Sequence, residues 1–490
     1  MDEAILDLLK ILKAEALALE PSEKEREEAR TKVVAYTERF LNQIDELKAY
    51  QTTDYKSKGL LEHPISNTPA PIESLLSLLE NFVDTPGINS ASGGHLGYIP
   101  GGGLYYSALG DYLAAVFNRY AGVNFSAPGA VQMEKVVLQW MASLIDFPSS
   151  FGGNLTSGTS IASLIAFVTA REAKSLTSKD YHRSVVYLSD LAHHSQEKAL
   201  KIAGLGDAVK RHIPIDDHFR MIPEALEDAV KKDLEVGLKP WLVVATIGTT
   251  DTGSIDPLEE LAAISAQYDL WYHVDAAYGG FFILTETGRN LMKGIEKADS
   301  VVLDPHKGLS VPFGLGAVLV RDQAEMVRAH QFEANYMQDA KVVADVSPAE
   351  VSPELSKHFR ALRLWLPLMV HGVEPFRQNL EEKLLLAQYF QAKIKSIPHF
   401  EVGPDPDLSI TIFRYVPDAG DANEFNQRLV KAIHEDGRVF LSSTVLDGKF
   451  TLRMAIVSFR THLETIDLAL EVIQQCVQKL LSEERLIENE

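Results

Sequence analysis

A lysine directly after a short apolar run is the residue of this chain best placed for covalent chemistry. Residues Val301–Leu303 form a run of the length of a buried strand, and Pro305 ends it because proline lacks a backbone donor. Lys307 therefore follows the carboxyl end of a strand, where open α/β sheets place their ligand crevices. A desolvated lysine there can form an imine with an aldehyde cofactor, whereas a surface lysine in a polar turn is the plainer interpretation.

Two other predicted turns carry groups that suit a phosphorylated ring. Thr159 and Ser160 open a helix after Gly158, and a helix N-terminus offers free N–H groups and a dipole that favour a phosphate. The alternative is a plain helix cap by one of these hydroxyls. His193 follows a predicted strand, and its flat imidazole can lie over a planar ring or simply be solvated at a helix start. No H-E-x-x-H pattern or cysteine partner accompanies His193 and His194, so no metal is expected.

An aspartate that closes a further apolar strand completes this set. Asp275 follows Tyr272–Val274 and precedes small residues, so its carboxylate can reach a ligand at the sheet edge. A carboxylate is the partner that pyridoxal phosphate needs for its protonated ring nitrogen, although a helix cap is the simpler alternative for Asp275. In chain order the groups supply a phosphate site, a ring-stacking imidazole, a pyridinium partner and an imine-forming lysine. Their combination favours pyridoxal phosphate as the cofactor.

The elements that must position these residues alternate between strand and helix. From about residue 150 to 322 the pattern predicts a mainly parallel sheet wrapped on both faces, the α/β class. We expect a helical segment at 1–85, a large domain at 86–370 and a small α+β domain at 371–490. Residues 323–355 are polar and predict an irregular loop. The predicted strands are 184–188, 241–247, 270–274, 300–303 and 315–320, with 408–415, 439–442 and 450–457 in the tail.

Composition excludes several classes of partner. The formal net charge of −21 argues against a nucleic-acid surface, which needs a basic footprint. The one cysteine, Cys476, excludes an internal disulfide framework and a cysteine-based zinc site. No apolar run reaches the ~18 residues that a spanning helix needs, and the acidic start Met1–Ala4 lacks the features of a secretory signal. We therefore expect a cytoplasmic protein without a membrane or nucleic-acid partner.

Five short blocks carry a resemblance to a known family. The most specific are Asp275-Ala276-Ala277 after His273-Val274, and Asp304-Pro305-His306-Lys307. Further blocks are Thr246–Thr250, Phe359–Trp365 and Leu441–Thr444. From about residue 65 to the C-terminus, the chain resembles the group II pyridoxal-phosphate-dependent amino-acid decarboxylases, the family of aromatic-L-amino-acid, glutamate and cysteine sulfinate decarboxylases. The resemblance implies the PLP-dependent transferase-like fold (fold type I), decarboxylation of an L-amino acid to its amine, and a homodimer with active sites at the interface.

The resemblance also implies a role for each matching residue. Lys307 resembles the lysine that holds the cofactor as an imine, Asp275 the partner of its ring nitrogen, and His193 the histidine stacked on its ring. Tyr336 stands where family decarboxylases keep a tyrosine that reprotonates the α-carbon, so Lys307, His193 and Tyr336 are the expected catalytic residues. The other implied contacts are Thr159, Ser160 and His306 on the phosphate side, Thr250 and Ala277 on the cofactor, Ser356 from the second subunit, and Tyr98 and Ile99 in the substrate pocket.

Three departures from the family pattern leave the substrate and the activity open. Ile161 stands where relatives often have a glutamate, Gly101-Gly102 replaces bulkier pocket residues, and His194 adds a second imidazole. The family resemblance, together with the absence of arginine within residues 93–103, implies an aromatic L-amino acid as substrate, while Arg453 leaves glutamate, aspartate or cysteine sulfinate open. The rival interpretations are another fold type I enzyme, such as an aminotransferase or a carbon–carbon lyase, and a cofactor-binding protein without turnover.

Overall fold

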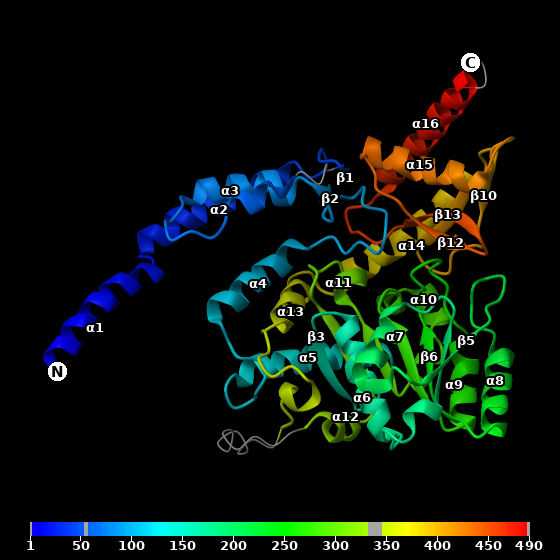
Figure 1. The fold of residues 1–490 in the computed structure, drawn as a ribbon, viewed down its shortest axis with the longest axis horizontal. Coiled ribbons are helices and arrows are strands. Elements are labelled where there is room, and N and C mark those ends of the chain that lie inside the picture. Colours follow the sequence, from blue (N-terminus) through cyan, green and yellow to red (C-terminus); the bar gives the residue numbers. More distant parts are fainter. Residues whose placement is uncertain (1, 53–56, 332–344, 488–490) are drawn as a thin grey trace.

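A seven-stranded sheet forms the centre of the molecule (Figure 1). The computed structural model describes residues 2–52, 57–331 and 345–487. In spatial order the strands are β3 (Gly152–Thr156), β9 (Gly316–Val320), β8 (Ser300–Leu303), β7 (Trp271–Ala276), β6 (Lys239–Thr246), β4 (Ser184–Ser189) and β5 (Val209–Ile213). The strands from β8 to β5 run parallel, whereas β9 pairs antiparallel with both β8 and β3. The expected mainly parallel α/β sheet is confirmed.

Helices bury both faces of this sheet. Along β4, Val185 and Tyr187 belong to one apolar core, and Val186 and Leu188 belong to another. A strand covered on both sides carries an unbroken apolar run instead of an alternating one, which is the pattern these strands have. The first core includes residues of α5 (Pro128–Leu144), α8 (Pro223–Glu235) and α9 (Leu258–Gln267); the second includes residues of α6 (Thr159–Ala173) and α7 (Ser195–Leu200).

The parallel strands end at one edge of the sheet, and the residues that follow them lie close together. In the strand ladders Thr246 of β6 is opposite Asp275 of β7, and Ala276 is opposite Leu303 of β8. A one-turn helix, α11 (Pro305–Gly308), carries Lys307 immediately beyond β8. The turn after β4 carries the predicted ring-stacking histidine and leads into α7. This edge is where open α/β sheets bind their ligands.

The C-terminal part has its own apolar core around a four-stranded antiparallel sheet. Its strand order is β10 (Phe400–Val402), β11 (Ile410–Tyr415), β13 (Lys449–Ala455) and β12 (Ser442–Leu446). The surrounding helices are α14 (Glu374–Lys395), α15 (Ala422–Asp436) and α16 (Leu463–Ile487), and α13 (Ala361–His371) precedes them. The strand predicted at 439–442 is displaced, because β12 begins only at Ser442.

The prediction of an irregular segment at 323–355 is wrong for its first residues, which form helix α12 (Gln323–His330). Asp322 caps this helix by accepting a hydrogen bond from the backbone N–H of Ala324, and Met326 is buried in the core shared with α6. This helix has only eight residues and one buried side chain, so its apolar period is too short to be recognised in the sequence.

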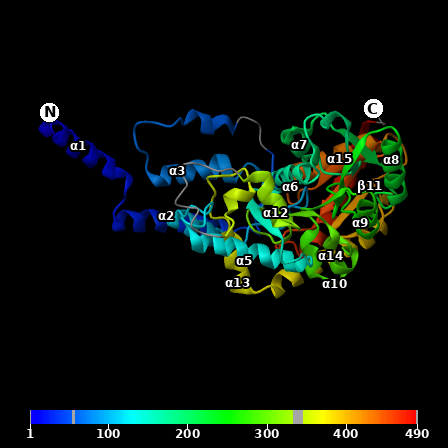
Figure 2. The same cartoon turned by 90° about the horizontal axis from the view of Figure 1, so that it is seen from below.

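The N-terminal helices α1 (Asp2–Ala16), α2 (Glu23–Asn42) and α3 (Ile72–Leu79) extend away from the sheet in both views (Figures 1 and 2). Neither α2 nor α3 contains a buried residue. On α1, Leu8 and Leu9 are 56% and 55% exposed, so an apolar stripe has no cover within this chain. None of the helices in the described ranges is long and apolar enough to cross a membrane.

Candidate active site

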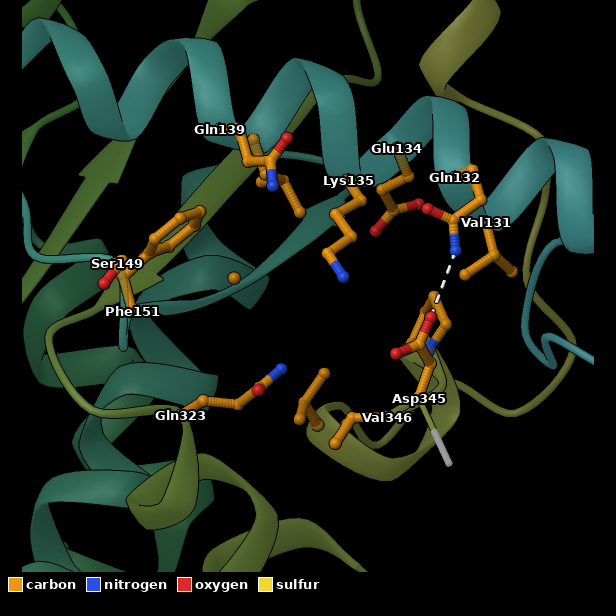
Figure 3. Close-up of a pocket in the computed structure, with 14 residues that line it drawn as sticks. Val131, Gln132, Glu134, Lys135, Gln139, Ser149, Phe151, Gln323, Asp345 and Val346 are labelled. Atoms are coloured by element: carbon orange, nitrogen blue, oxygen red, sulfur yellow. Dashed lines mark hydrogen bonds between the residues drawn. The ribbon is translucent and has the colours of Figure 1, made fainter. Parts of the chain in front are cut away.

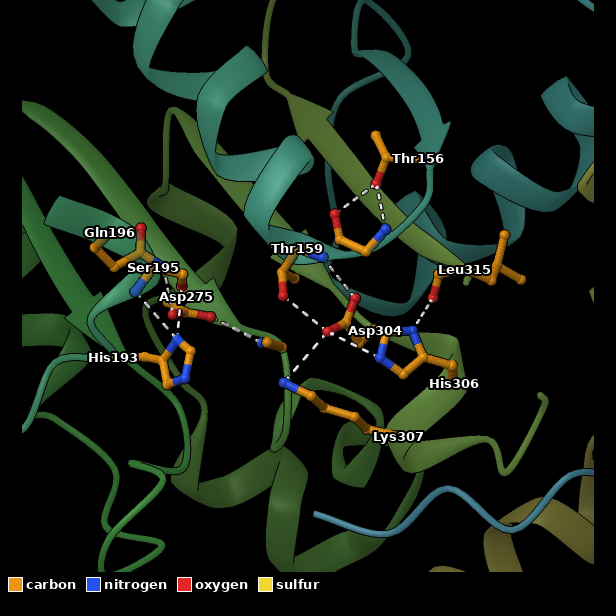
Figure 4. A network of polar contacts seen from close by, with 12 residues as sticks. Thr156, Thr159, His193, Ser195, Gln196, Asp275, Asp304, His306, Lys307 and Leu315 are labelled. Carbon is orange, nitrogen blue, oxygen red and sulfur yellow. Dashed lines mark hydrogen bonds and ion pairs between the residues drawn. The ribbon is translucent and has the colours of Figure 1, made fainter. Parts of the chain in front are cut away.

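Lys307 lies beside the buried carboxylate of Asp304, which is hydrogen-bonded to the start of α6 (Figure 4). Its Nζ atom lies 3.2 Å from Oδ2 of Asp304, and the lysine side chain keeps 22% exposure while the aspartate side chain keeps 2%. Asp304 also accepts hydrogen bonds from the backbone N–H of Thr159 at 2.9 Å and from its hydroxyl at 2.8 Å. Asp304 therefore links the lysine turn to the N-terminus of α6.

Asp275 presents a buried carboxylate at the end of β7. The residue is 5% exposed, and its Oδ1 accepts a hydrogen bond from the backbone N–H of Ala277 at 3.1 Å. Its Oδ2 accepts one from Nε2 of Gln196 at 2.5 Å. Two neutral donors thus hold the carboxylate, and each oxygen keeps a further lone pair for a ligand. The prediction that strand β7 delivers Asp275 to the sheet edge is confirmed.

His193 lies at the same edge with a defined tautomer. Its Nδ1 accepts from the backbone N–H of Ser195 at 3.3 Å, so the Ser195 hydroxyl, 2.7 Å from Nδ1, donates to it as well, and the neutral ring carries its proton on Nε2. Burial lowers the pKa of His193, the charge on Asp275 partly offsets this, and the charges on His194 and Lys307 lower it further. The imidazole is therefore neutral near pH ~7.

The phosphate-side residues divide into two groups. The N–H and hydroxyl of Thr159 are held by Asp304, whereas Ser160 is exposed in the first turn of α6, as is Ser157 just before it. Nδ1 of His306 donates to the carbonyl oxygen of Leu315 at 2.6 Å, and Nε2 lies 3.6 Å from Oδ2 of Asp304 (Figure 4). The exposed serine hydroxyls at a helix N-terminus suit an anion.

The predicted substrate segment is clamped by the C-terminal domain. Tyr98 has a left-handed backbone (φ 52°) and a 58% exposed side chain. Its N–H donates to Oγ of Ser442 at 3.2 Å, and its carbonyl oxygen accepts from Arg453 at 3.0 Å. Arg453 also donates to Oγ of Ser442 at 2.7 Å. Ser442 and Arg453 thus fix both backbone groups of Tyr98 and hold the half-buried Ile99 beside it.

The departures from the family pattern have structural causes. A Cβ atom at Gly101 would lie 2.1 Å from the carbonyl oxygen of His306, so only glycine allows this segment to approach the lysine turn so closely. Gly102 has φ +112°, which also favours glycine. Ile161 packs against the core beneath α6, and His194 stacks near His193 with ring centroids 4.1 Å apart.

Two further predicted residues make no hydrogen bond to this group among the described residues, and a third is not among the residues that the structure describes. Thr250 is half-buried in the turn after β6. Ser356 is exposed next to Lys357, whose buried amine binds Glu134 of α5 at 2.5 Å and Asn154 of β3 at 2.8 Å. Tyr336 lies outside the described residues. The roles of these three residues stay predictions.

Sequence analysis gave no role to Gln196 and did not recognise Asp304 as the centre of a network. Asp304 lies in the Asp304-Pro305-His306-Lys307 motif. Its bonds to Thr159, however, join residues far apart in the chain and leave no local pattern. Gln196 had a usable signal: it follows His193 by three residues at a predicted helix start, a spacing that places both on one side of a helix.

A separate cavity of about 250 Å³ lies between α5 and the segment around Asp345 (Figure 3). Gln132 donates to Asp345 across its rim at 3.3 Å. Glu134 also lines it, but its carboxylate is engaged by Lys357. None of the residues that line this cavity belongs to the group around Lys307 and Asp275.

The residues at the sheet edge fit pyridoxal phosphate. An amine with partial exposure, a buried carboxylate and a neutral imidazole lie around one space (Figure 4). The start of α6 carries the exposed hydroxyls of Ser157 and Ser160. The buried hydroxyl oxygen of Ser310, just after the lysine turn, has no hydrogen-bond partner among the described residues. These groups match the aldehyde, ring nitrogen, ring face and phosphate of that cofactor.

Comparison with known proteins extends this result over most of the chain. The family model for the pyridoxal-dependent decarboxylase conserved domain matches residues 55–416. The aromatic-L-amino-acid decarboxylase of Bacillus atrophaeus is 36% identical over 375 residues, which cover 75% of this chain and 78% of that protein. Tryptophan decarboxylase 2 of Oryza sativa subsp. japonica is 31% identical over 443 residues, 86% of this chain and 88% of that protein. A solved structure of Oryza sativa TDC with PLP and tryptamine matches with a TM-score of 0.88 at 24% identity, covering 94% and 99% of the two chains.

The fold and the site together define a pyridoxal-phosphate-dependent enzyme of fold type I. The family match and the two relatives narrow the class further. The chain belongs to the pyridoxal-dependent decarboxylase family, and its activity is pyridoxal-phosphate-dependent decarboxylation of an amino acid. The expected family, fold, cofactor and reaction are confirmed.

Proposed function

We propose that this enzyme decarboxylates aromatic L-amino acids, with Lys307, Asp275 and His193 at the reacting centre. The observation that carries the assignment of the centre is the buried Asp275 carboxylate at the same sheet edge as the Lys307 amine. Pyridoxal phosphate, when bound, supplies a cationic ring that accepts the electron pair left when carbon dioxide departs. Asp275 keeps the proton on the ring nitrogen, and Lys307 binds the cofactor and returns when the amine product leaves.

His193 covers the ring face as a neutral group. Because its pKa is lowered by burial, it adds no positive charge that would compete with the ring nitrogen for Asp275. The proton that the His193 imidazole can donate is on Nε2, since its Nδ1 accepts a hydrogen bond from Ser195. We assign the final protonation of the α-carbon to Tyr336, or to His193 acting through it.

An aromatic substrate is supported by the surroundings of the Tyr98 segment. Two arginines contact this segment. The two terminal nitrogens of Arg453 are engaged by Ser442 and by the carbonyl oxygen of Tyr98, and Arg460 donates to the carbonyl oxygens of Ala91 and Gly102. Arg453 is also 2% exposed, so recognition of an acidic side chain would require it to leave both partners. The relatives reported above act on aromatic amino acids according to their names.

A homodimer is supported by the uncovered apolar surface of the N-terminal helices. Ser157, Ser160 and Ser356 are exposed in the single chain, as expected if a second subunit completes the phosphate side. We further propose that the enzyme acts in the cytoplasm. Light scattering that reports a stable monomer at micromolar concentration would contradict the dimer.

The substrate assignment is tested by carbon dioxide release from purified protein supplied with pyridoxal phosphate. We expect turnover of tryptophan, tyrosine or phenylalanine and none of glutamate, aspartate or cysteine sulfinate. Release from an acidic amino acid alone would overturn the substrate, whereas accumulation of a pyridoxamine form with amino donors would indicate an aminotransferase instead. Lys307→Ala is the negative control for each substrate.

A further inference from the structure

Gln196 is the fully buried side chain that touches the Asp275 carboxylate. It lies in the first turn of α7, is 0% exposed, and its Nε2 donates to Oδ2 of Asp275 at 2.5 Å. The two residues are 79 positions apart in the sequence, and this bond ties α7 to the end of β7. The other carboxylate oxygen is held by the N–H of Ala277. Gln196 is therefore the one side-chain donor to Asp275 among the described residues.

The orientation of the Gln196 amide is determined by Asp275. If the amide were reversed, its oxygen would face a carboxylate oxygen, and neither atom can donate. In the observed orientation Oε1 of Gln196 is buried and has no hydrogen-bond partner among the described residues. Leaving a buried carbonyl unpaired destabilises a protein, so an apolar residue would serve packing alone at least as well. The amide is consequently explained by its effect on Asp275.

A hydrogen bond to a carboxylate has two effects on that group. It fixes the rotamer of Asp275, and it withdraws negative charge from the oxygen that it contacts, which makes the carboxylate a weaker base. The titratable groups with a charge interaction with this carboxylate are His193 and His273. His194, Asp251 and Lys307, which is paired with Asp304, act in turn on His193. None of these donates a hydrogen bond to Asp275 in the structure, so the Gln196 amide acts on the carboxylate without competition from them.

We propose that Gln196 is a positioning residue, which fixes Asp275 against the ring nitrogen of the cofactor and weakens its pull on that nitrogen. The inference rests on the proposed function, because it needs Asp275 to face the cofactor ring. Without the amide, the contacted oxygen of Asp275 keeps more of its negative charge, and the carboxylate stabilises positive charge on the cofactor more strongly. Loss of the donor should therefore raise the pH at which the lysine-bound cofactor gives up its proton.

The test is a spectroscopic pH titration of the bound cofactor, with no substrate present. Wild type, Gln196→Met, Gln196→Leu and the exposed control Lys198→Met are loaded with pyridoxal phosphate, and the visible band is followed with pH. We expect both Gln196 variants to shift the midpoint upward by about 0.5 pH unit or more, since one charge-assisted hydrogen bond to a charged group changes a proton equilibrium by about one pH unit and part of that effect reaches the cofactor. We expect the control to keep the wild-type midpoint.

The possible failures are distinguishable. A wild-type protein that forms no visible band with pyridoxal phosphate would overturn the proposed function and this inference with it. Wild-type bands and midpoints in both folded Gln196 variants, checked by circular dichroism, would overturn the inference and leave the proposed function intact. Leucine is included because its side chain is shorter than that of methionine and branched, so a variant that fails to fold because of its shape leaves the other to decide.

Discussion

Gly101→Ala is the substitution for which the structure predicts the sharpest loss of activity. The added Cβ would lie 2.1 Å from the carbonyl oxygen of His306, and contacts below 3.0 Å are essentially never adopted, so the two segments must separate by about 0.9 Å. His306 directly precedes Lys307, and the movement is therefore passed to the amine that binds the cofactor. A misplacement of about 1 Å at a reacting group costs on the order of 100-fold in rate, equivalent to about 2.7 kcal/mol.

The assay for this prediction is steady-state release of carbon dioxide from an aromatic amino acid at saturating cofactor. We expect kcat/KM of Gly101→Ala to fall by about 100-fold. Gly129→Ala is the matched control, because Gly129 has no atom within 4 Å of the added Cβ and lies exposed in a helix. Overpacking also costs stability, on the order of 1–3 kcal/mol, so activity is compared only below the melting transition. Wild-type kcat/KM in Gly101→Ala would refute the close approach of the two segments.

Two further predictions concern stability. Lys357→Met leaves the buried Glu134 without its cation, so the free energy of unfolding in urea should fall by about 3–5 kcal/mol. The double variant Glu134→Leu/Lys357→Met should recover most of this loss. A Lys357→Met protein as stable as wild type would contradict the buried ion pair. Burial lowers the pKa of His273 to about 4 from the ordinary 6.5, so the unfolded chain binds a proton that the folded chain does not as the pH falls below 6.5. Stability is therefore lost on acidification, by about 2 kcal/mol between pH ~7 and ~5. His273→Gln should reduce that pH dependence by this amount in urea melts at the two pH values, and an unchanged dependence would show that His273 is not buried as a neutral group.

The centre of the sheet could be predicted from the sequence because its strands are covered on both faces. Residues Val301–Leu303 and Val185–Leu188 are unbroken apolar runs, and both became strands at the predicted places. The edge strands were missed for the opposite reason. β3 begins with two glycines, and β5 carries Lys210, Arg211 and His212, so neither shows an apolar run.

The identities of the principal site groups were predictable, but their contacts were not. Lys307, Asp275 and His193 each follow or end a strand, so local pattern sufficed to select them. The clamp on Tyr98 joins it to Ser442 and Arg453, more than 300 positions away, and no local pattern reports such a bond. Gln196 was likewise not selected, because the one side-chain hydrogen bond that it makes among the described residues joins helix α7 to Asp275 of strand β7.

The most direct test of the account is the absorption spectrum of the purified protein with pyridoxal phosphate. Wild type and the exposed-lysine control Lys293→Ala should both show a visible band that remains after free cofactor is removed. Lys307→Ala should lack this band and should release no carbon dioxide. A Lys307→Ala protein that retains both the band and turnover would contradict the assignment of Lys307 as the residue that binds the cofactor.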